Sequence, residues 1–95
     1  MKVVFSKLAV RDLQAIGAWI SADRPNAARK LIHGLQATCA ALAKRPHAYQ
    51  LVEGREGDGM RRAPYTRYVI YYREEEGQIQ IVRILDGARD IASLL

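Results

Sequence analysis

The last third of the chain holds two runs of aromatic and β-branched residues joined by a short acidic link that contains a glycine. The first run spans residues 65–73, the link residues 74–77 and the second run residues 78–90. Such runs predict an antiparallel hairpin, and the link predicts a loop of about three to five residues rather than the two-residue kind. Because both runs are apolar at nearly every position, we expect them at the centre of a sheet with at least one face under helices.

Two amphipathic segments in the first half of the chain predict the helices that cover this sheet. A short β-prone run at residues 2–5 comes first, and the hydroxyl of Ser6 is suited to cap a helix that starts at Lys7. Apolar residues then recur at steps of three and four, which predicts a helix that ends near residues 21–22.

A second helix is expected over residues 25–43. Asp23 is suited to be its N-cap, and Pro25 fits a first helical turn, where its missing N–H costs nothing. Pro46 marks the stop. Because the link between the two helices is so short, they should form an antiparallel helical hairpin whose apolar stripe lies on the sheet.

The segment between the second helix and the strand hairpin is less regular. Residues 49–52 predict an edge strand, the glycines within residues 54–59 predict a mobile loop, and residues 60–63 predict a short strand or the lead into the central one. Pro64 argues against uninterrupted pairing at that point. The expected order is β-α-α-β-β-β in one domain over residues 1–95, an α+β fold with a helical hairpin packed on a mostly antiparallel sheet.

The net charge of +5 is concentrated in the first half of the chain. Residues 1–45 carry eight basic side chains against two acidic ones, whereas residues 46–95 carry seven arginines against eight acids. A basic half predicts a surface for nucleic acid or a dock for an acidic partner, and the alternative is a solvated helix face that keeps a small protein soluble. The single cysteine, the charged N-terminus and the lack of a long apolar run favour a cytoplasmic protein without a membrane span.

The sequence offers little that could carry covalent or metal chemistry. Cys39, His33 and His47 form no clustered set of ligands, so neither a metal nor another cofactor is expected. Cys39 lies on the apolar stripe of the second helix, which predicts a core residue rather than a nucleophile. No lysine or histidine follows Tyr49 that would act as a general base at neutral pH, and we expect no catalytic residue.

Arginines and tyrosines are interleaved along the predicted sheet. Guanidinium groups bind phosphate and tyrosines stack on bases, which would suit an RNA-binding or RNA-cleaving face. The acids of the same half, and the packing role of tyrosine in strands, support a structural interpretation instead. Trp19 likewise has two interpretations, a core residue or the border of a groove for a partner's helix. The arginines and tyrosines concerned are Arg55, Arg61, Arg62, Arg67, Arg73, Arg83 and Arg89 with Tyr65, Tyr68, Tyr71 and Tyr72.

Several short motifs follow one another along the whole chain. They are Ser6-x-x-Ala9-x-x-Asp12-Leu13-x-x-Ile16 with Trp19-Ile20, then Leu42-x-x-x-Pro46 after a helix that begins behind a proline, then Arg67-Tyr68-Val69-Ile70-Tyr71-Tyr72-Arg73, and finally Ile79-x-Ile81-Val82-Arg83-Ile84-Leu85-Asp86-Gly87-Ala88-Arg89-Asp90. In this order the chain resembles the RelE/ParE superfamily of bacterial toxins, and within it the ParE branch. The resemblance implies a toxin of a type II toxin–antitoxin system that inhibits DNA gyrase by binding, is not an enzyme, and is silent in complex with a cognate ParD-type antitoxin.

The ribosome-dependent branch of the same superfamily implies an alternative function, the cleavage of messenger RNA. Arg89 matches one arginine of that branch. Tyr68 stands where the branch has another arginine, and Leu95 stands about where it has a tyrosine. The lysine pair of that branch has no counterpart, and Arg61 and Arg62 are the nearest basic residues. These departures favour the gyrase-directed branch.

The candidate site residues follow from the resemblance together with the surface chemistry. A basic helical hairpin suits an acidic antitoxin tail that folds on binding, and a strand at residues 49–52 would accept an added strand. No direct DNA binding is expected of the toxin alone, and Asp86, where many relatives carry histidine, has no assigned role. The antitoxin is expected to contact Trp19, Ile20, Leu31, Tyr49 and Leu51, and the target is expected to contact Arg83, Arg89 and Asp90.

Overall fold

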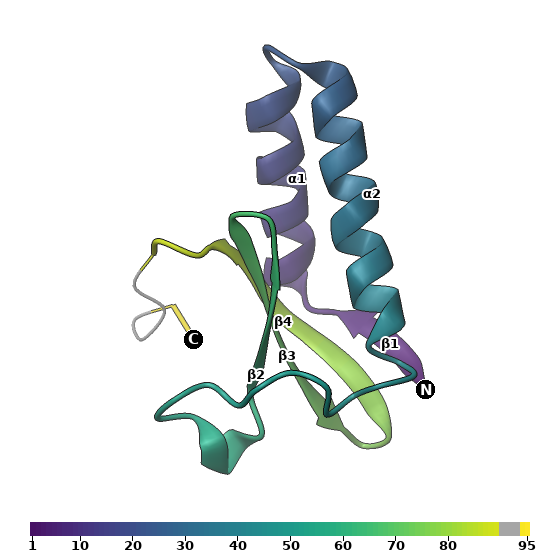
Figure 1. Cartoon of the computed structure of the whole chain (residues 1–95), viewed down its shortest axis with the longest axis vertical. Helices are drawn as coiled ribbons and strands as arrows, with labels where there is room; N and C mark the ends of the chain where they lie inside the picture. Colours follow the sequence, from purple (N-terminus) through teal and green to yellow (C-terminus); the bar gives the residue numbers. More distant parts are fainter. Residues whose placement is uncertain (90–93) are drawn as a thin grey trace.

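The computed structural model describes residues 1–89 and 94–95, and it places two helices against a four-stranded sheet (Figure 1). The strand order is β1-β4-β3-β2, with β1 parallel to β4 and the other two pairings antiparallel. The predicted element order and α+β class are confirmed, and the predicted hairpin forms the centre of the sheet. The elements are β1 (Lys2–Phe5), α1 (Lys7–Ser21), α2 (Pro25–Ala41), a 3₁₀ turn (Glu56–Asp58), β2 (Arg61–Tyr65), β3 (Tyr68–Glu75) and β4 (Gln78–Asp86).

The turn between β3 and β4 is tighter than the sequence predicted. Glu74 and Glu75 continue the β3 ladder, so the β3–β4 turn contains only Glu76 and Gly77, both with positive φ (53° and 72°). Two positive values in succession match the twist of an antiparallel hairpin. The expected longer loop was wrong because acidic side chains are tolerated at an exposed strand end. The predicted start of the first run at residue 65 was wrong too, because Tyr65 belongs to β2 and a two-residue turn separates it from β3.

A bulge in β4 resets its alternation. The pairing register shifts between Tyr71 and Tyr72 of β3, which leaves Val82 as an extra residue on β4. Ile81 and Ile84 therefore both join the cluster under the helices, although they are an odd number of residues apart. In each half of β4, side chains alternate between the two faces of the sheet. The bulge shifts this alternation by one residue between the two halves, which explains why the apolar run in the sequence looks nearly continuous.

Helix α1 replaces β1 as the neighbour of β4 along the second half of that strand. The short strand β1 pairs only with residues 78–81. Beyond it, the Ser6 hydroxyl donates to the Val82 carbonyl (2.7 Å), and the Asp12 carboxylate accepts from the Ile84 N–H (2.9 Å). Backbone groups that would otherwise form an open sheet edge thus have partners on α1 and on its N-cap residue.

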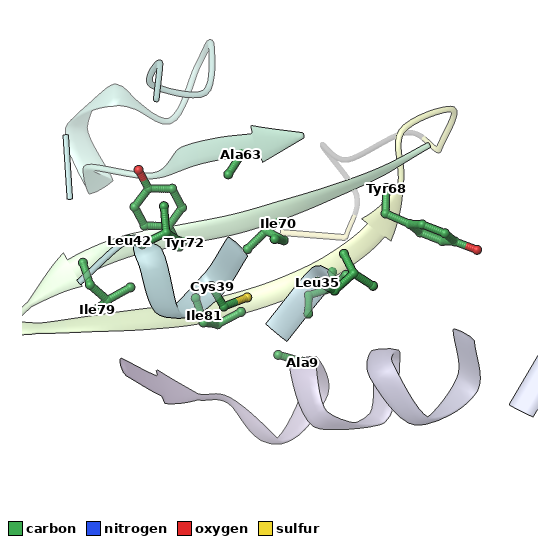
Figure 2. Packing of buried hydrophobic residues seen from close by; sticks show 11 residues of the cluster. Ala9, Leu35, Cys39, Leu42, Ala63, Tyr68, Ile70, Tyr72, Ile79 and Ile81 are labelled. Atoms are coloured by element: carbon green, nitrogen blue, oxygen red, sulfur yellow. The ribbon is translucent and has the colours of Figure 1, made fainter. Parts of the chain in front are cut away.

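The sheet is covered on both faces, which explains why β3 has five consecutive buried residues. One cluster joins the sheet to α1 and α2, and Figure 2 shows side chains from these elements meeting there. A second cluster on the other face joins Val52 and Met60 of the connector to Tyr71 and its neighbours on the sheet, and Leu94 and Leu95 pack against this cluster. The first cluster consists of Ala9, Leu35, Cys39, Leu42, Ala63, Tyr68, Ile70, Tyr72, Ile79, Ile81 and Ile84.

Cys39 lies within the first cluster, as predicted. Its side chain is 1% exposed. Burial raises the pKa of its thiol to about 12, so almost no thiolate exists at neutral pH. This cysteine therefore serves packing.

The helix ends agree with prediction for α1 and differ for α2. The Ser6 hydroxyl accepts from the backbone N–H of Ala9, the third residue of α1, and that helix ends at Ser21. Asp23 was wrong as the N-cap of α2, because Arg24 holds that position without a side-chain cap bond. The proline that follows lacks an N–H, so this end needs one partner fewer. Helix α2 ends at Ala41, two residues before the predicted end.

The connector between α2 and β2 forms less strand than expected. Of residues 49–52, Leu51 forms a single bridge to Arg61. The glycine-rich loop contains the 3₁₀ turn at Glu56–Asp58. Pro64 pairs with a residue of β3 inside β2, so the expectation of interrupted pairing was wrong. Strand β2 lies at the end of the strand order, where a residue without an N–H is tolerated.

Two helical glycines give a paired test of the packing. A Cβ at Gly34 would lie 1.8 Å from the Tyr65 hydroxyl oxygen, whereas a Cβ at Gly17 would meet Ile32 at 3.6 Å, an ordinary contact. Gly34→Ala should therefore displace the Tyr65 ring and lower the free energy of unfolding by about 1–2 kcal/mol. Gly17→Ala should raise it by roughly 0.5–1 kcal/mol through helix propensity. Urea denaturation measures both, and shifts of the same sign would contradict this packing.

Candidate binding site

Trp19 is the most exposed large apolar side chain among residues 1–89. It lies in the last turns of α1 and is 82% exposed. The interpretation of Trp19 as a core residue is therefore wrong. Because exposed tryptophans are costly to solvate and enriched in interface cores, the side chain marks a candidate contact surface.

A hollow of about 250 Å³ opens beside Trp19, between α1 and the end of β4. We call it the Trp19 groove. It exists because β4 continues past β1, so α1 and not a strand borders the end of the sheet. Acidic, basic and apolar side chains meet in it. Its lining consists of Asp12, Ala15, Ile16, Trp19, Arg67, Tyr68, Ile84, Leu85, Asp86 and Arg89.

An ion pair at the inner end of the groove fastens α1 to β4. Arg83 Nε donates to Asp12 Oδ2 (2.8 Å) and Nη2 donates to Oδ1 (3.0 Å), and the side chains are only 14% and 13% exposed. The hydrogen bonds that Arg83 donates to Asp12 raise the pKa of Arg83. The remaining Nη1 donates to the Leu94 carbonyl (3.3 Å), which ties the end of the chain to the same place. The guanidinium of Arg83 is thus engaged within the fold, and contact with a target stays a prediction.

A second, exposed ion pair forms the outer edge of the groove. Arg67 Nε donates to Asp86 Oδ2 (2.8 Å), and its Nη2 donates to the same oxygen. The other oxygen of Asp86 accepts from the Ala88 N–H (3.0 Å). The Ala88 N–H, then Arg67 and Arg89, lower the pKa of Asp86, so this carboxylate is charged at neutral pH. Asp86, to which the sequence assigned no role, closes the turn after β4 and also binds Arg67.

Arg89 is a second exposed cation in the lining of the groove. Its backbone N–H donates to the Asp86 carbonyl (3.0 Å), which fixes the chain where it leaves β4. Within the described part of the chain its guanidinium forms no ion pair. Asp90, the third predicted target contact, lies outside the described residues.

The other predicted antitoxin contacts are not in the Trp19 groove. Ile20 and Leu31 are half-buried, and Leu31 packs against the core. Tyr49 packs there too, and its carbonyl accepts from Arg61 Nη1 (2.7 Å). Leu51 is 37% exposed and faces the same arginine across the single bridge. Tyr49 and Leu51 thus lie beside the start of β2, whereas the groove adjoins the opposite end of that strand.

The interleaved arginines and tyrosines fit the structural interpretation. Tyr68, Tyr71 and Tyr72 are 8%, 1% and 1% exposed, so an RNA base has no access to their faces. The Tyr72 hydroxyl donates to the Pro46 carbonyl (2.9 Å), and burial raises its pKa. Most of the arginines have acidic partners as well. The pairs are Arg55–Asp58, Arg67–Asp86, Arg73–Glu75 and Arg83–Asp12.

The sequence assigned no site role to Asp12 and named Arg67 only among the interleaved arginines, yet both residues line the groove. The sequence signal that could have identified Asp12 is its negative charge, since it is one of only two acidic residues in the strongly basic first half of the chain. Across residues 1–89 and 94–95, histidine, cysteine, aspartate and glutamate nowhere gather in a group of three within reach of one metal ion. The same residues contain no helix long and apolar enough to cross a membrane.

The sequence matches the family described as the ParE toxin of the type II toxin–antitoxin system parDE over residues 3–91. The fold resembles a chain of the chromosomal ParDE toxin–antitoxin system from P. aeruginosa (TM-score 0.77, 21% identity, 90% of this chain and 95% of that chain covered). It also resembles a chain of the toxin–antitoxin complex RelBE2 from Mycobacterium tuberculosis (TM-score 0.57, 24% identity, 90% and 95% covered). No curated protein sequence is a significant match.

Proposed function

The chain belongs to the ParE toxin family of type II toxin–antitoxin systems, and from this premise we propose that it inhibits DNA gyrase by binding and is neutralised by a ParD-type antitoxin. The observation that carries the proposal is the exposed Trp19 beside a groove with arginines at its rim. Such a surface is suited to gripping another macromolecule. The similar structures come from toxin–antitoxin systems, which supports an antitoxin as one partner.

The antitoxin is proposed to dock on the basic helical side of the molecule. The first 45 residues carry eight basic side chains and two acidic ones, and Asp12 is already neutralised by Arg83. An acidic segment would be drawn to this side, with Trp19 as the apolar anchor and Ile20 and Leu31 beside it. Because Tyr49 and Leu51 lie far along the sheet from Trp19, contact with all five requires an extended antitoxin segment that wraps the chain.

The absence of suitable catalytic groups in the groove supports binding rather than chemistry. The pKa of Asp86 is lowered, so that carboxylate is a weak base, and Asp12 is held by Arg83. His33 and His47 belong to α2 and the following connector, and neither lines the groove. Within the described lining no side chain is thus suited to take up a proton near pH 7. The alternative function is the cleavage of ribosome-bound messenger RNA. The exposed arginines beside the Trp19 indole support this alternative, because such groups can bind RNA.

The two functions are separated by assays with purified components. The proposed function predicts that the chain stops supercoiling by DNA gyrase, that a ParD-type antitoxin restores it, and that ribosome-bound message stays intact. Cleavage of that message while gyrase remains active would replace the proposal with the ribonuclease alternative.

Arg89 is the main residue that we propose for contact with the target, and Arg83 and Asp90 are the other two proposed contacts. Arg89→Ala should raise the concentration needed for half-inhibition of supercoiling by about tenfold, since contacts through an exposed guanidinium are worth roughly 1–2 kcal/mol. Thermal stability should stay unchanged, because the side chain is exposed. Arg45→Ala, an exposed arginine outside the groove, is the control of equal charge. Equal inhibition by both variants would remove Arg89 from the target contact.

A further inference from the structure

Three groups around the Trp19 groove would together suit a single-stranded nucleic acid. The Trp19 indole is exposed and presents a face on which a base can stack. Arg67 and Arg89 line the same groove and carry guanidiniums that bind phosphate. By these groups alone, the groove would be expected to bind a phosphate-bearing strand.

One carboxylate stands among these groups. Asp86 Oδ2 accepts hydrogen bonds from Nε and Nη2 of Arg67, so these two donors of the guanidinium already bind an anion of the protein itself. Arg89 also lies close enough to lower the pKa of Asp86. Asp12 is the other acid of the lining, and it is bound to Arg83. Asp86 is therefore the carboxylate of the groove that faces Arg67 and Arg89.

The position of this carboxylate is fixed by the backbone. Its second oxygen accepts from the Ala88 N–H, and the Gly87 N–H donates to the Arg67 carbonyl (2.8 Å), so the turn after β4 and the β2–β3 turn are held together. A phosphate group of a ligand would have to displace the Asp86 carboxylate from Arg67. Because this carboxylate is part of the folded chain, its pairing with Arg67 costs no entropy of association, and it would also repel the phosphate.

We propose that Asp86 is a built-in counter-ion that excludes nucleic acid from the Trp19 groove and so restricts this surface to protein partners. The proposal goes beyond the proposed function, because it concerns what the groove rejects and holds whether or not gyrase is the target.

Asp86→Asn tests the proposal. Asparagine has the same shape, and its oxygen can still accept from the Ala88 N–H, so the turn should persist. The probe is a short single-stranded oligouridine, and the readout is the fluorescence of Trp19, which is the only tryptophan of the chain. The variant should bind the oligonucleotide about tenfold more tightly than the unaltered chain. Its affinity should also fall more steeply with salt, by roughly 0.7 in the log–log slope for each phosphate newly contacted.

Glu75→Gln is the matched control. It removes the same charge from the exposed Arg73–Glu75 pair at the other end of the hairpin, outside the groove. It should leave oligonucleotide binding unchanged, and Asp86→Asn combined with Arg89→Ala should lose the gain. Equal gains by Asp86→Asn and Glu75→Gln would mean that net charge alone acts, and tight binding by the unaltered chain would overturn the proposal. If circular dichroism shows that Asp86→Asn is unfolded, Asp86→Ser, whose hydroxyl can accept from Ala88, takes its place with the same expected gain.

Discussion

Replacing Asp12 by alanine is expected to lower the free energy of unfolding by about 3–5 kcal/mol, a large share of what a domain of this size has. The Asp12 carboxylate accepts from two nitrogens of Arg83 and from the Ile84 N–H, at distances of 2.8–3.0 Å. Its loss leaves a largely buried guanidinium and a strand-edge N–H without their partner. Urea denaturation monitored by circular dichroism measures the change.

The exposed Arg73–Glu75 pair supplies the comparison. Glu75→Ala removes an ion pair whose members are 32% and 45% exposed, and the loss should stay below about 0.5 kcal/mol. Replacing Asp12 and Arg83 together by leucine should recover part of the loss, because no unpaired charge is then buried. A cost for Asp12→Ala as small as that for Glu75→Ala would show that this pair does not fasten α1 to the sheet.

Trp19→Ala is expected to weaken the complex with a cognate antitoxin by roughly 5- to 150-fold, equivalent to about 1–3 kcal/mol, the range for an aromatic anchor at an interface centre. Stability of the free chain should not fall, because the side chain is 82% exposed and packs against little. Equilibrium binding of the purified pair, with thermal denaturation of the free variant, gives both quantities.

Leu8→Ala is the matched control for this prediction. Leu8 is also an exposed apolar residue of α1, at 48%, but it lies in the first turn and does not line the groove. Its removal should change antitoxin affinity by less than about twofold, within the range of peripheral contacts. If Trp19→Ala and Leu8→Ala weaken binding equally, Trp19 is not the anchor.

The centre of the fold was predictable because its signals are local. The β-rich runs of the terminal hairpin, the Ser6 cap and the three-four spacing of the helices each lie within a few residues of sequence. The length of the β3–β4 turn was mispredicted because strand pairing extended through Glu74 and Glu75, whose composition alone favours a loop. Pro64 was mispredicted because its tolerance depends on β2 being at an edge, which is a property of the whole sheet.

The groove was not predictable because its contacts join distant parts of the chain. Asp12 and Arg83 are 71 residues apart, and Arg67 and Asp86 are 19 apart. No periodicity of one segment identifies such partners. Two interpretations of Trp19 stayed open because helical spacing does not decide whether a residue at the border of the apolar stripe is buried or exposed. The predicted contact set likewise mixed residues from both ends of the sheet.

Equilibrium binding between the purified chain and purified DNA gyrase, followed by mass measurement of both proteins, is the most direct test that this toxin acts by attachment. We expect saturable binding that stoichiometric ParD-type antitoxin abolishes, with both polypeptides recovered at unchanged mass. Failure to bind gyrase, together with cutting of ribosome-bound message by the same preparation, would contradict the account.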